Sequence, residues 1–418
     1  MATPVTPPRG MRDFLPADKA SREHALAVIR RSFAAHGFDE IETPVLEDAA
    51  RLHSGLGGDN EKLAFAVLKR GLKPTDAAAA AASGDLLGLA DLGLRFDLTV
   101  PLARFYATHR AELPTVFRSI QIAPVWRAER PQKGRYRQFV QCDIDIIGES
   151  GLLAEIELIT ATAAALDALG LTGCSIRVND RRILTALLAH WSVAPELNER
   201  ALIVIDKLDK IGVDGVVTEL AGLGIATDGV ADTLTQIADA GWTAAEPTPP
   251  AWLNTDAFAD LLALRAAMPE VRLVFDPTLV RGMGYYTGTI FEISHPDLGY
   301  SLGGGGRYDG MIGRFLGTEV PACGFSIGFE RIVDLLGVDA ASAENAVVLV
   351  YDKGTDPARL VALKRTLVEQ GLRVRLEQRT KNVKALLERA AGAGYGRYSF
   401  VGADVSGAGE LDFRPLGG

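Results

Sequence analysis

The chain has 418 residues, of which 48% are hydrophobic, 23% charged and 7% aromatic, and these proportions are typical of a globular protein with a full core. They exclude a disordered chain, a collagen-like chain and a disulfide scaffold, and the net charge of −9 argues against a protein that coats nucleic acid indiscriminately. Three widely spaced cysteines indicate no disulfide framework or zinc cluster, and no apolar run is as long as the roughly 18 residues of a membrane span. The Pro-rich N-terminus lacks the apolar stretch of a signal peptide, so we expect a reduced, cytoplasmic setting and no membrane contact.

The first elements are a helix and a short strand. Residues 16–37 predict an amphipathic helix with Ala25, Ile29 and Phe33 on one face, and residues 39–45 predict a strand that turns near Pro44. A run of alanines within residues 76–83 favours a loop insertion or a short helix. Residues 92–100 then predict a second strand, followed by a helix from residue 101.

The most regular stretch is residues 115–148, where two strand-like runs (115–129 and 137–147) flank a polar turn, as in an antiparallel hairpin. The second run alternates with a period of two. One face is apolar, and the other carries Arg137, Phe139, Gln141, Asp143 and Asp145. A strand face with so many polar groups is either open to water or the floor of a ligand site.

Beyond residue 152 the pattern is mainly helical up to residue 264, with a Pro-rich break at 247–250. A strand at 271–275 leads to the block LVRGMGYYTGTIFEI and then to a glycine run, 303–306. That run resembles a loop whose backbone closely approaches a ligand, although a tight entry into a strand would also require glycine. A linker near 337–345 precedes a final module of alternating strands and helices, typical of a small mixed α/β domain.

The final module is basic, while the rest of the chain is acidic. Residues 345–418 hold 12 Lys and Arg against 8 Asp and Glu. This excess fits a local contact with an anion such as one stem of a folded RNA, and it also fits a solvated surface with chance asymmetry.

Two sets of arginines indicate anion binding. Five basic residues lie between positions 127 and 137, and Arg forks match phosphate oxygens in bidentate fashion. Arg281 and Arg331 lie within apolar or small-residue blocks, where a guanidinium requires an anionic partner. That partner is a phosphate, a substrate carboxylate or an internal salt bridge.

Taken in order, these blocks resemble the histidyl-tRNA synthetases, a family of class II aminoacyl-tRNA synthetases, over nearly the whole chain. PRGMRDFLP and GFDEIETPVLE resemble the family's dimer-forming first motif, FRSIQIAPVWRAERPQKGRYRQFVQCDIDIIG its second and CGFSIGFERI its third. LRFDLTVP and LVRGMGYYTGTIFE resemble its two histidine-specific blocks. One departure is that Met283 and Gly284 stand where the family commonly has Leu-Asp.

The resemblance implies an α+β fold in which helices flank an antiparallel class II sheet, with a helical insertion and a C-terminal α/β anticodon-binding domain. The expected division is a catalytic core at 1–184, a helical insertion at 185–264, the rest of the core at 265–337, and the anticodon-binding domain at 345–418. It also implies a homodimer that activates L-histidine with ATP and Mg²⁺ and transfers it to tRNA(His), with no metal bound by protein residues.

By the same resemblance, Arg127 and Arg281 are the catalytic residues, which approach the α-phosphate from opposite sides. The expected ATP-binding residues are Arg127, Glu129, Arg135, Phe139 and Arg331. The expected histidine-binding residues are Asp97, Thr99, Gln141, Asp145, Arg281, Tyr285 and Tyr286. Ordinary strand packing would also account for the tyrosine pair.

Two other functions compete with this prediction. A non-catalytic paralogue, such as the regulatory subunit of ATP phosphoribosyltransferase, would share the catalytic fold but is expected to lack the C-terminal module and some motif arginines, and this chain retains both. A generic RNA-binding protein would explain the basic module but not Arg127, Arg281 and Arg331.

Overall fold

The computed structural model describes residues 5–53, 63–131, 134–281, 284–336 and 345–416. Lys133 of the basic turn, Met283 and most of the expected linker therefore lie outside the described residues. The chain forms two compact units, one comprising Met1–Arg12 and Leu26–Asp334 and the other Asp13–Ala25 and Leu335–Gly418. Among the described residues, no helix has the length and apolar character needed to cross a bilayer.

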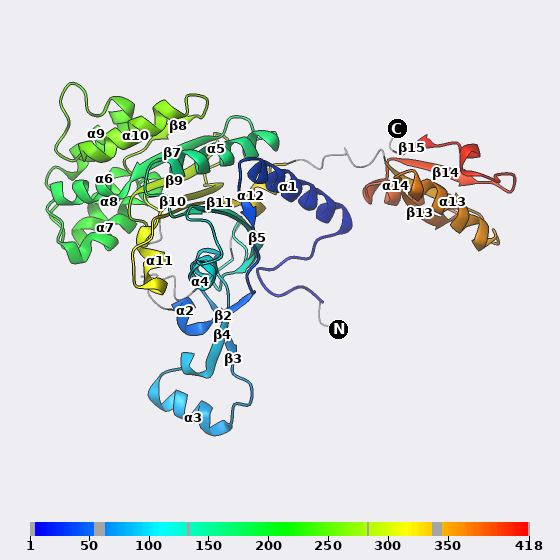
Figure 1. Ribbon diagram of the computed structural model, residues 1–418, viewed down its shortest axis with the longest axis horizontal. Coiled ribbons are helices and arrows are strands. Elements are labelled where there is room, and N and C mark those ends of the chain that lie inside the picture. Colours follow the sequence, from blue (N-terminus) through cyan, green and yellow to red (C-terminus); the bar gives the residue numbers. More distant parts are fainter. Residues whose placement is uncertain (1–4, 54–62, 132–133, 282–283, 337–344, 417–418) are drawn as a thin grey trace. The chain divides into compact units, whose positions relative to one another are not determined.

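An eight-stranded, mostly antiparallel sheet forms the centre of the larger unit (Figure 1). This architecture confirms the predicted α+β fold class. The strand order is β1-β5-β6-β11-β10-β9-β7-β8, and the β1–β5 and β7–β8 pairs are parallel. The bounds are β1 Asp39–Glu40, β5 Phe117–Trp126, β6 Gln138–Ile147, β7 Ser175–Asp180, β8 Leu273–Phe275, β9 Thr289–Ser294, β10 Gly303–Arg307 and β11 Ala322–Gly328.

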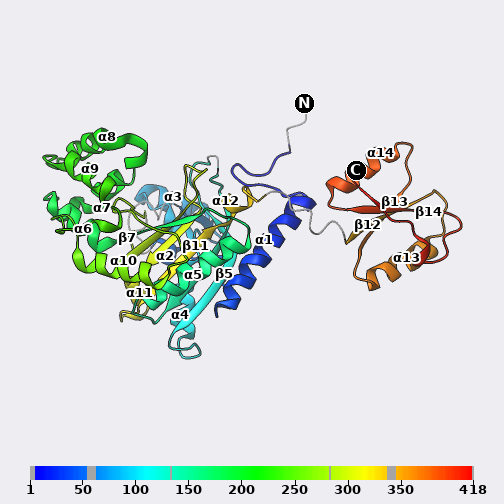
Figure 2. The same ribbon diagram turned by 90° about the horizontal axis from the view of Figure 1, so that it is seen from above.

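The helices of this unit lie against or beside the sheet, and α6–α9 gather at one end of it (Figures 1 and 2). Their bounds are α1 Pro16–Ala35 (of which the residues from Leu26 on belong to this unit), α2 Ala49–His53, α4 Thr99–His109, α5 Leu153–Ala168, α6 Arg181–His190, α7 Asn198–Ile205, α8 Leu208–Gly222, α9 Val230–Ala240, α10 Thr255–Ala267, α11 Asp309–Leu316 and α12 Phe329–Val333. The helix predicted over residues 16–37 is confirmed, because α1 buries Ala25, Ile29 and Phe33.

Two predicted strands end earlier than expected, and one observed strand was not predicted. The strand expected at 39–45 ends at Glu40, after two residues paired with β5, and the chain bends at Val45, directly after Pro44. The strand expected at 92–100 ends at Leu94, and α4 begins at Thr99, where the Asp97 carboxylate accepts a hydrogen bond from the Val100 amide. Strand β7 lies within the stretch expected to be helical and pairs with both β8 and β9.

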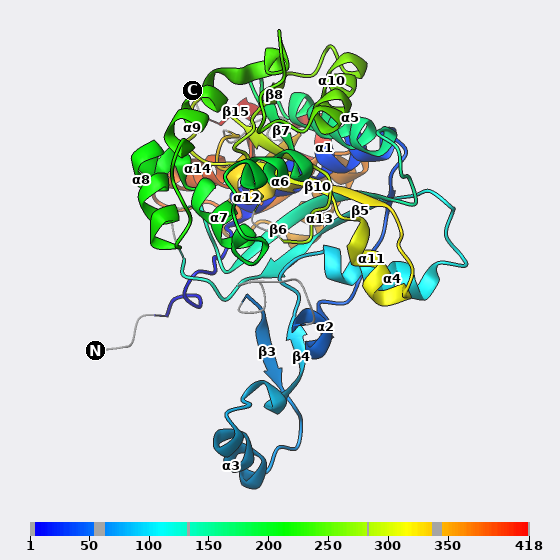
Figure 3. The same cartoon turned by 90° about the vertical axis from the view of Figure 1, so that its left-hand side faces the viewer.

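A smaller three-stranded sheet, β2-β4-β3, projects from the larger unit together with α3 (Figures 1 and 3). Its strands are β2 Leu46–Asp48, β3 Phe65–Leu68 and β4 Ala90–Leu94, and α3 spans Pro74–Ser83. The alanine run therefore forms a helix, which contributes no buried residue.

The C-terminal unit carries a four-stranded sheet in the order β13-β12-β14-β15, with β12 Ala346–Tyr351, β13 Arg373–Gln378, β14 Arg397–Val401 and β15 Arg414–Pro415. Helices α13 (Pro357–Glu369) and α14 (Val383–Gly392) pack on opposite faces, because alternate residues of β12 enter two separate cores. The predicted alternation of strands and helices is confirmed, and β15 is an additional short strand.

Candidate functional site

A cavity of about 1050 Å³ lies over the central sheet, and all twelve site residues predicted from the sequence line it. They come from the start of α4 and the residues just before it, the connection between β5 and β6, strand β6, the segment before β9, and α12. The sequence therefore selected residues that the fold brings together, although they span positions 97–331.

The polar face of β6 forms part of the cavity floor. Gln141, Asp143 and Asp145 line the cavity with exposed fractions of 8%, 5% and 4%. The Gln141 side-chain amide donates to Ser326 Oγ at 3.2 Å and to Asp143 Oδ2 at 3.3 Å. This face therefore lines the floor of a cavity and does not lie open to water, and its role in binding a ligand stays a prediction.

The glycine run is a strand, β10, rather than a loop, and its glycines leave room for the cavity. A Cβ at Gly304 would lie 2.5 Å from Cζ of Arg281, and one at Gly324 on neighbouring β11 would overlap the Asp145 carboxylate. A Cβ at Gly304 would also lie 2.6 Å from the Phe291 carbonyl oxygen, a backbone atom that cannot move aside as a side chain can, so a larger residue at either position would disturb the cavity.

One part of the cavity has cations and an aromatic ring in the arrangement expected for a nucleotide. The Arg127 guanidinium lies 5.0 Å from the centre of the Phe139 ring, and its Nε donates to the Phe96 carbonyl at 3.0 Å. Arg331 donates to the Ser301 carbonyl, and burial, followed by the charge of Arg135, lowers its pKa. Arg135 pairs with Glu129 at 3.6 Å and is half exposed.

An ion pair with Glu292 holds Arg281 in the cavity wall. Its Nη1 lies 2.7 Å from Glu292 Oε2, and Arg177 contacts the other oxygen of the same carboxylate at 3.3 Å. The predicted alternative of an internal salt bridge thus holds for Arg281. Both Arg281 and Arg331 are only partly buried and open into the cavity, so each can also receive an anionic ligand.

Buried carboxylates cluster at the inner end. Burial raises the pKa of Asp145 to about 7 and that of Asp97 to about 6, and it raises the pKa of Asp143 well above its usual value with help from the charge of Asp145. The Tyr308 hydroxyl donates to Asp145 Oδ1 at 2.7 Å, whereas Asp97 Oδ2 has no hydrogen-bond partner among the residues that the structure describes.

Three tyrosines surround these carboxylates. The rings of Tyr285 and Tyr286 lie 4.7 Å apart, and Tyr308 meets Tyr285 edge-on at 6.0 Å. Burial raises the pKa of all three hydroxyls, so they remain protonated hydrogen-bonding groups. Tyr285 and Tyr286 pack against each other, as the alternative of ordinary packing predicted, and both also line the cavity.

The sequence did not assign Tyr308, Glu292, Ser326 or Asp143 to the site, although all four line the cavity. Asp143 was placed on the polar face of its strand, and that alternation was the available signal. Tyr308 and Glu292 follow apolar or glycine-rich runs with no local pattern that distinguishes them from packing residues.

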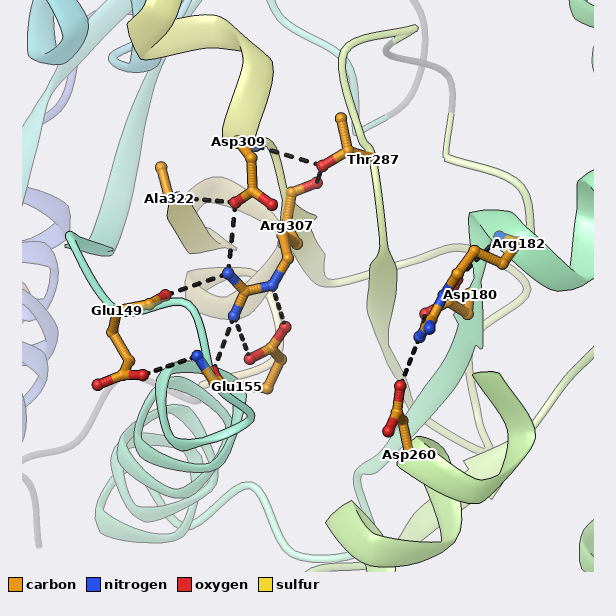
Figure 4. Close-up of polar contacts among 10 residues, drawn as sticks. Glu149, Glu155, Asp180, Arg182, Asp260, Thr287, Arg307, Asp309 and Ala322 are labelled. Carbon is orange, nitrogen blue, oxygen red and sulfur yellow. Dashed lines mark hydrogen bonds and ion pairs between the residues drawn. The ribbon is translucent and has the colours of Figure 1, made fainter. Parts of the chain in front are cut away.

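A buried ion pair supports the site from the side of β10 and α11 (Figure 4). Arg307 contacts both oxygens of Glu155 at 2.7 Å, and its side chain also reaches Asp309. The Arg307 carbonyl accepts from the Thr287 amide, directly after the tyrosine pair. Arg307 therefore links α5 to the segments that carry Tyr286 and Tyr308.

Comparison with known proteins gives consistent results. The model of the family described as histidyl-tRNA synthetase matches residues 10–332. A histidine–tRNA ligase of Leifsonia xyli is 65% identical over 429 residues, covering 100% of this chain and 99% of the relative. The crystal structure of histidyl-tRNA synthetase from Nostoc sp. PCC 7120 superposes with a TM-score of 0.76 at 25% identity, covering 99% of this chain and 95% of that one. A structure from Bacillus halodurans, described as an ATP phosphoribosyltransferase regulatory subunit/histidyl-tRNA synthetase, has a TM-score of 0.74 over 96% and 98% of the two chains; at 22% identity it shows the fold alone.

Proposed function

This chain belongs to the histidyl-tRNA synthetase family and is a histidine–tRNA ligase, and from that premise we propose that its central cavity performs both steps of the reaction. In the first step the histidine carboxylate attacks the α-phosphorus of ATP, forming histidyl-adenylate and releasing pyrophosphate. In the second step the terminal ribose hydroxyl of tRNA(His) takes the histidyl group and AMP leaves. Because this reaction serves translation, we place it in the cytoplasm.

For the nucleotide, Phe139 stacks on the adenine and Glu129 accepts from its amino group. Arg331 binds the γ-phosphate, and Arg135 meets the outer phosphates. Support comes from the position of all four side chains in one cavity. Arg135 is the most exposed of the cavity arginines, as suits a contact with the leaving pyrophosphate.

Arg127 and Arg281 stabilise the charge that develops on the α-phosphate. Arg127 is anchored through its Nε to the Phe96 carbonyl, which leaves its terminal nitrogens for phosphate and substrate carboxylate. Arg281 approaches from the other side while Glu292 holds it in place. Arginines fixed before the reaction need no reorganisation when charge appears, which is the physical basis of their effect.

Histidine is bound by Asp97, Thr99 and Gln141 at its α-amino group, and by Asp145, Tyr285 and Tyr286 around its ring. The observation that carries this assignment is the group of buried carboxylates for which the described residues provide no ion-pair partner, which suits a ligand with two basic groups. Asp145, fixed by Tyr308, keeps one oxygen for a ring N–H.

Mg²⁺ neutralises the phosphates when ATP is bound. In the described parts of the chain, no group of three or more His, Cys, Asp or Glu residues could hold a metal ion. Mg²⁺ commonly binds through substrate phosphates, water and only one or two carboxylates, so these residues fit an ion that enters with ATP.

The four expected segments take the proposed roles of catalytic core (1–184 and 265–337), helical insertion (185–264) and anticodon-binding domain (345–418). The alternative of a regulatory paralogue is disfavoured because Arg127, Arg281 and Arg331 all line the cavity, and because the 65% identical relative is a ligase. A generic RNA-binding protein would not require this cavity.

Pyrophosphate exchange with each of the twenty amino acids, with and without tRNA, tests the proposal. We expect ATP-dependent exchange with histidine alone, and transfer of histidine to tRNA(His). Exchange with another amino acid would show that the pocket is misassigned, and binding of histidine without any exchange would favour the regulatory paralogue.

A further inference from the structure

Three buried carboxylates share the inner end of the cavity. Asp97, Asp143 and Asp145 line it with exposed fractions of 2%, 5% and 4%. Asp143 and Asp145 are two positions apart on one face of β6, which places their Cα atoms about 6.8 Å apart along the strand. Their charges interact, since each additional carboxylate raises the pKa of Asp143.

Cations of the protein do not balance this cluster. Within the described part of the chain, no ion pair joins any of the three carboxylates to a Lys or Arg side chain, and Arg127 is the cation whose charge reaches Asp97 and Asp143. The other titratable groups around the cluster are neutral or more remote: Tyr285, Tyr286, Tyr308, Cys323 and Arg281. Ionisation of all three carboxylates becomes favourable only when a ligand brings cationic groups into the cluster.

Histidine can supply one or two cations. Its α-ammonium takes one carboxylate, assigned above to Asp97. A neutral imidazole presents one N–H donor and one acceptor, whereas an imidazolium presents two donors. Asp143 and Asp145 remain for the ring. They lie on one face of β6, at a spacing that allows each carboxylate to accept one N–H of the same ring.

The existing hydrogen bonds leave both carboxylates able to accept. Tyr308 donates to Oδ1 of Asp145 and so leaves Oδ2 for the ligand. Asp143 accepts from the Gln141 amide at 3.4 Å and 3.3 Å and is also hydrogen-bonded to Ser326. The bonds from Gln141 are long, and each carboxylate oxygen has more than one acceptor site, so a charged donor would replace or supplement them.

We propose that Asp143 is a specificity-determining residue which, together with Asp145, holds the substrate side chain as an imidazolium with one ring N–H bonded to each carboxylate. This inference rests on the proposed function, because it names the protonation state of histidine in the same pocket. As the neutral ring arrives, Asp143 passes its proton to the ring, so the imidazolium and the ionised Asp143 form an internal ion pair and no lone buried charge is left.

The test is a nitrogen NMR spectrum of ring-¹⁵N-labelled histidine bound to the full chain at pH 8. Free histidine is only about 3% imidazolium at that pH, given a ring pKa of about 6.5. We expect both ring nitrogens of the bound ligand to carry protons in the wild type. In Asp143→Asn we expect a neutral bound ring at pH 8, and histidine affinity at least about tenfold weaker at pH 7, which corresponds to the loss of one charge-assisted hydrogen bond.

Controls separate this inference from the proposed function. Asp167→Asn removes an exposed carboxylate on α5 and should leave both the spectrum and the affinity unchanged. A neutral ring bound to the wild type at pH 8 would overturn the inference alone, and this result does not depend on whether Asp143→Asn folds. Failure of histidine to bind the wild type at all would overturn the proposed function instead.

Discussion

At the scale of single residues, the shape of the cavity depends on positions that lack a side chain. Gly304 has no side chain because the Arg281 guanidinium occupies that space, and Glu292 fixes the guanidinium from the adjacent strand. A cation positioned in this way costs little to align when a transition state develops negative charge. The site thus depends on a missing Cβ as much as on the arginine itself.

Arg281→Ala is expected to lower the rate of histidyl-adenylate formation by about 10²–10³-fold, the usual effect of removing one preorganised donor. ATP affinity should change far less, because the interaction strengthens as charge develops. Single-turnover adenylation and equilibrium ATP binding measure the two effects separately. Arg265→Ala, on the exposed side of α10, serves as the control, and unchanged adenylation in Arg281→Ala would remove this arginine from the mechanism.

Asp145→Asn is expected to stabilise the protein while impairing histidine activation. Asp145 titrates near pKa 7 when folded but near 3.9 when unfolded, so the folded state binds the proton more tightly and stability falls as pH rises between these values. Removing the buried charge should therefore raise the free energy of unfolding by roughly 1–4 kcal/mol at pH 8 and by almost nothing near pH 4. Urea unfolding at both pH values measures this difference. A less stable variant at pH 8 would mean that the bond from Tyr308 outweighs the cost of burying the charge.

Among individual residues, the sequence predicted those that belong to long motifs and missed those that only the fold brings in. Gln141 and Asp145 share a strand face whose alternation is legible in the chain. Tyr308 reaches Asp145 from 163 positions away, and Glu292 meets Arg281 across a turn. No local pattern encodes such contacts, because they depend on the pairing of β6, β11, β10 and β9.

At the scale of elements, strands with alternating polar and apolar residues could be predicted from the sequence, whereas strands and helix ends that depend on distant contacts could not. The β5–β6 hairpin has ten paired residues in each strand, and both strands were expected. By contrast, β7 was missed within a helical stretch, since its strand conformation depends on β8 and β9. The start of α4 was also displaced, because the Asp97 carboxylate accepts from the Val100 amide before the predicted helix begins. Tertiary contacts and caps override propensity at these points.

The link between α5 and β10 provides a stability prediction. Arg307 forms a two-point ion pair with Glu155, whose side chain is 1% exposed, so Glu155→Gln leaves a mostly buried guanidinium with only the more exposed Asp309 carboxylate as a charge partner among the described residues. We expect a loss of about 3–5 kcal/mol. Asp260→Asn breaks the exposed pair with Arg182 (Figure 4) and should cost about 0–1 kcal/mol. Chemical unfolding of both variants compares them, and equal losses would show that the Glu155 pair contributes no more than a surface contact.

At the scale of the whole molecule, we expect a symmetric homodimer built on the first motif, α1 and β1. Two apolar side chains within this motif, Val45 and Leu46, remain 40% and 39% exposed on the single chain. Sedimentation equilibrium at micromolar protein should give a mass about twice the 44.6 kDa of one chain. A mass of one chain under these conditions would contradict the assignment of this motif.

The C-terminal module has its own two cores and a basic corner, which gives the last prediction its physical basis. Arg373 and Arg375 both lie over the Tyr395 ring, at 4.5 and 4.6 Å, and Arg379 lies 5.2 Å from the Phe400 ring. Arginines placed beside aromatic rings combine charge for phosphates with flat surfaces for unpaired bases. We therefore assign anticodon binding to this corner, together with Lys381 and Lys384, rather than a role in solubility alone.

A chain that ends before Asn345 should still exchange pyrophosphate to some extent but charge tRNA(His) very poorly, because adenylate forms in the other unit.

A second variant keeps the full chain: Arg379→Glu with Lys384→Glu should weaken tRNA binding and reduce its dependence on salt concentration, since fewer counterions are released. Arg365→Glu changes charge on exposed α13 and is the matched control. Aminoacylation and filter binding across a salt series distinguish the cases. If the double variant and the control behave alike, the basic corner is a solvated surface and the anticodon is bound elsewhere.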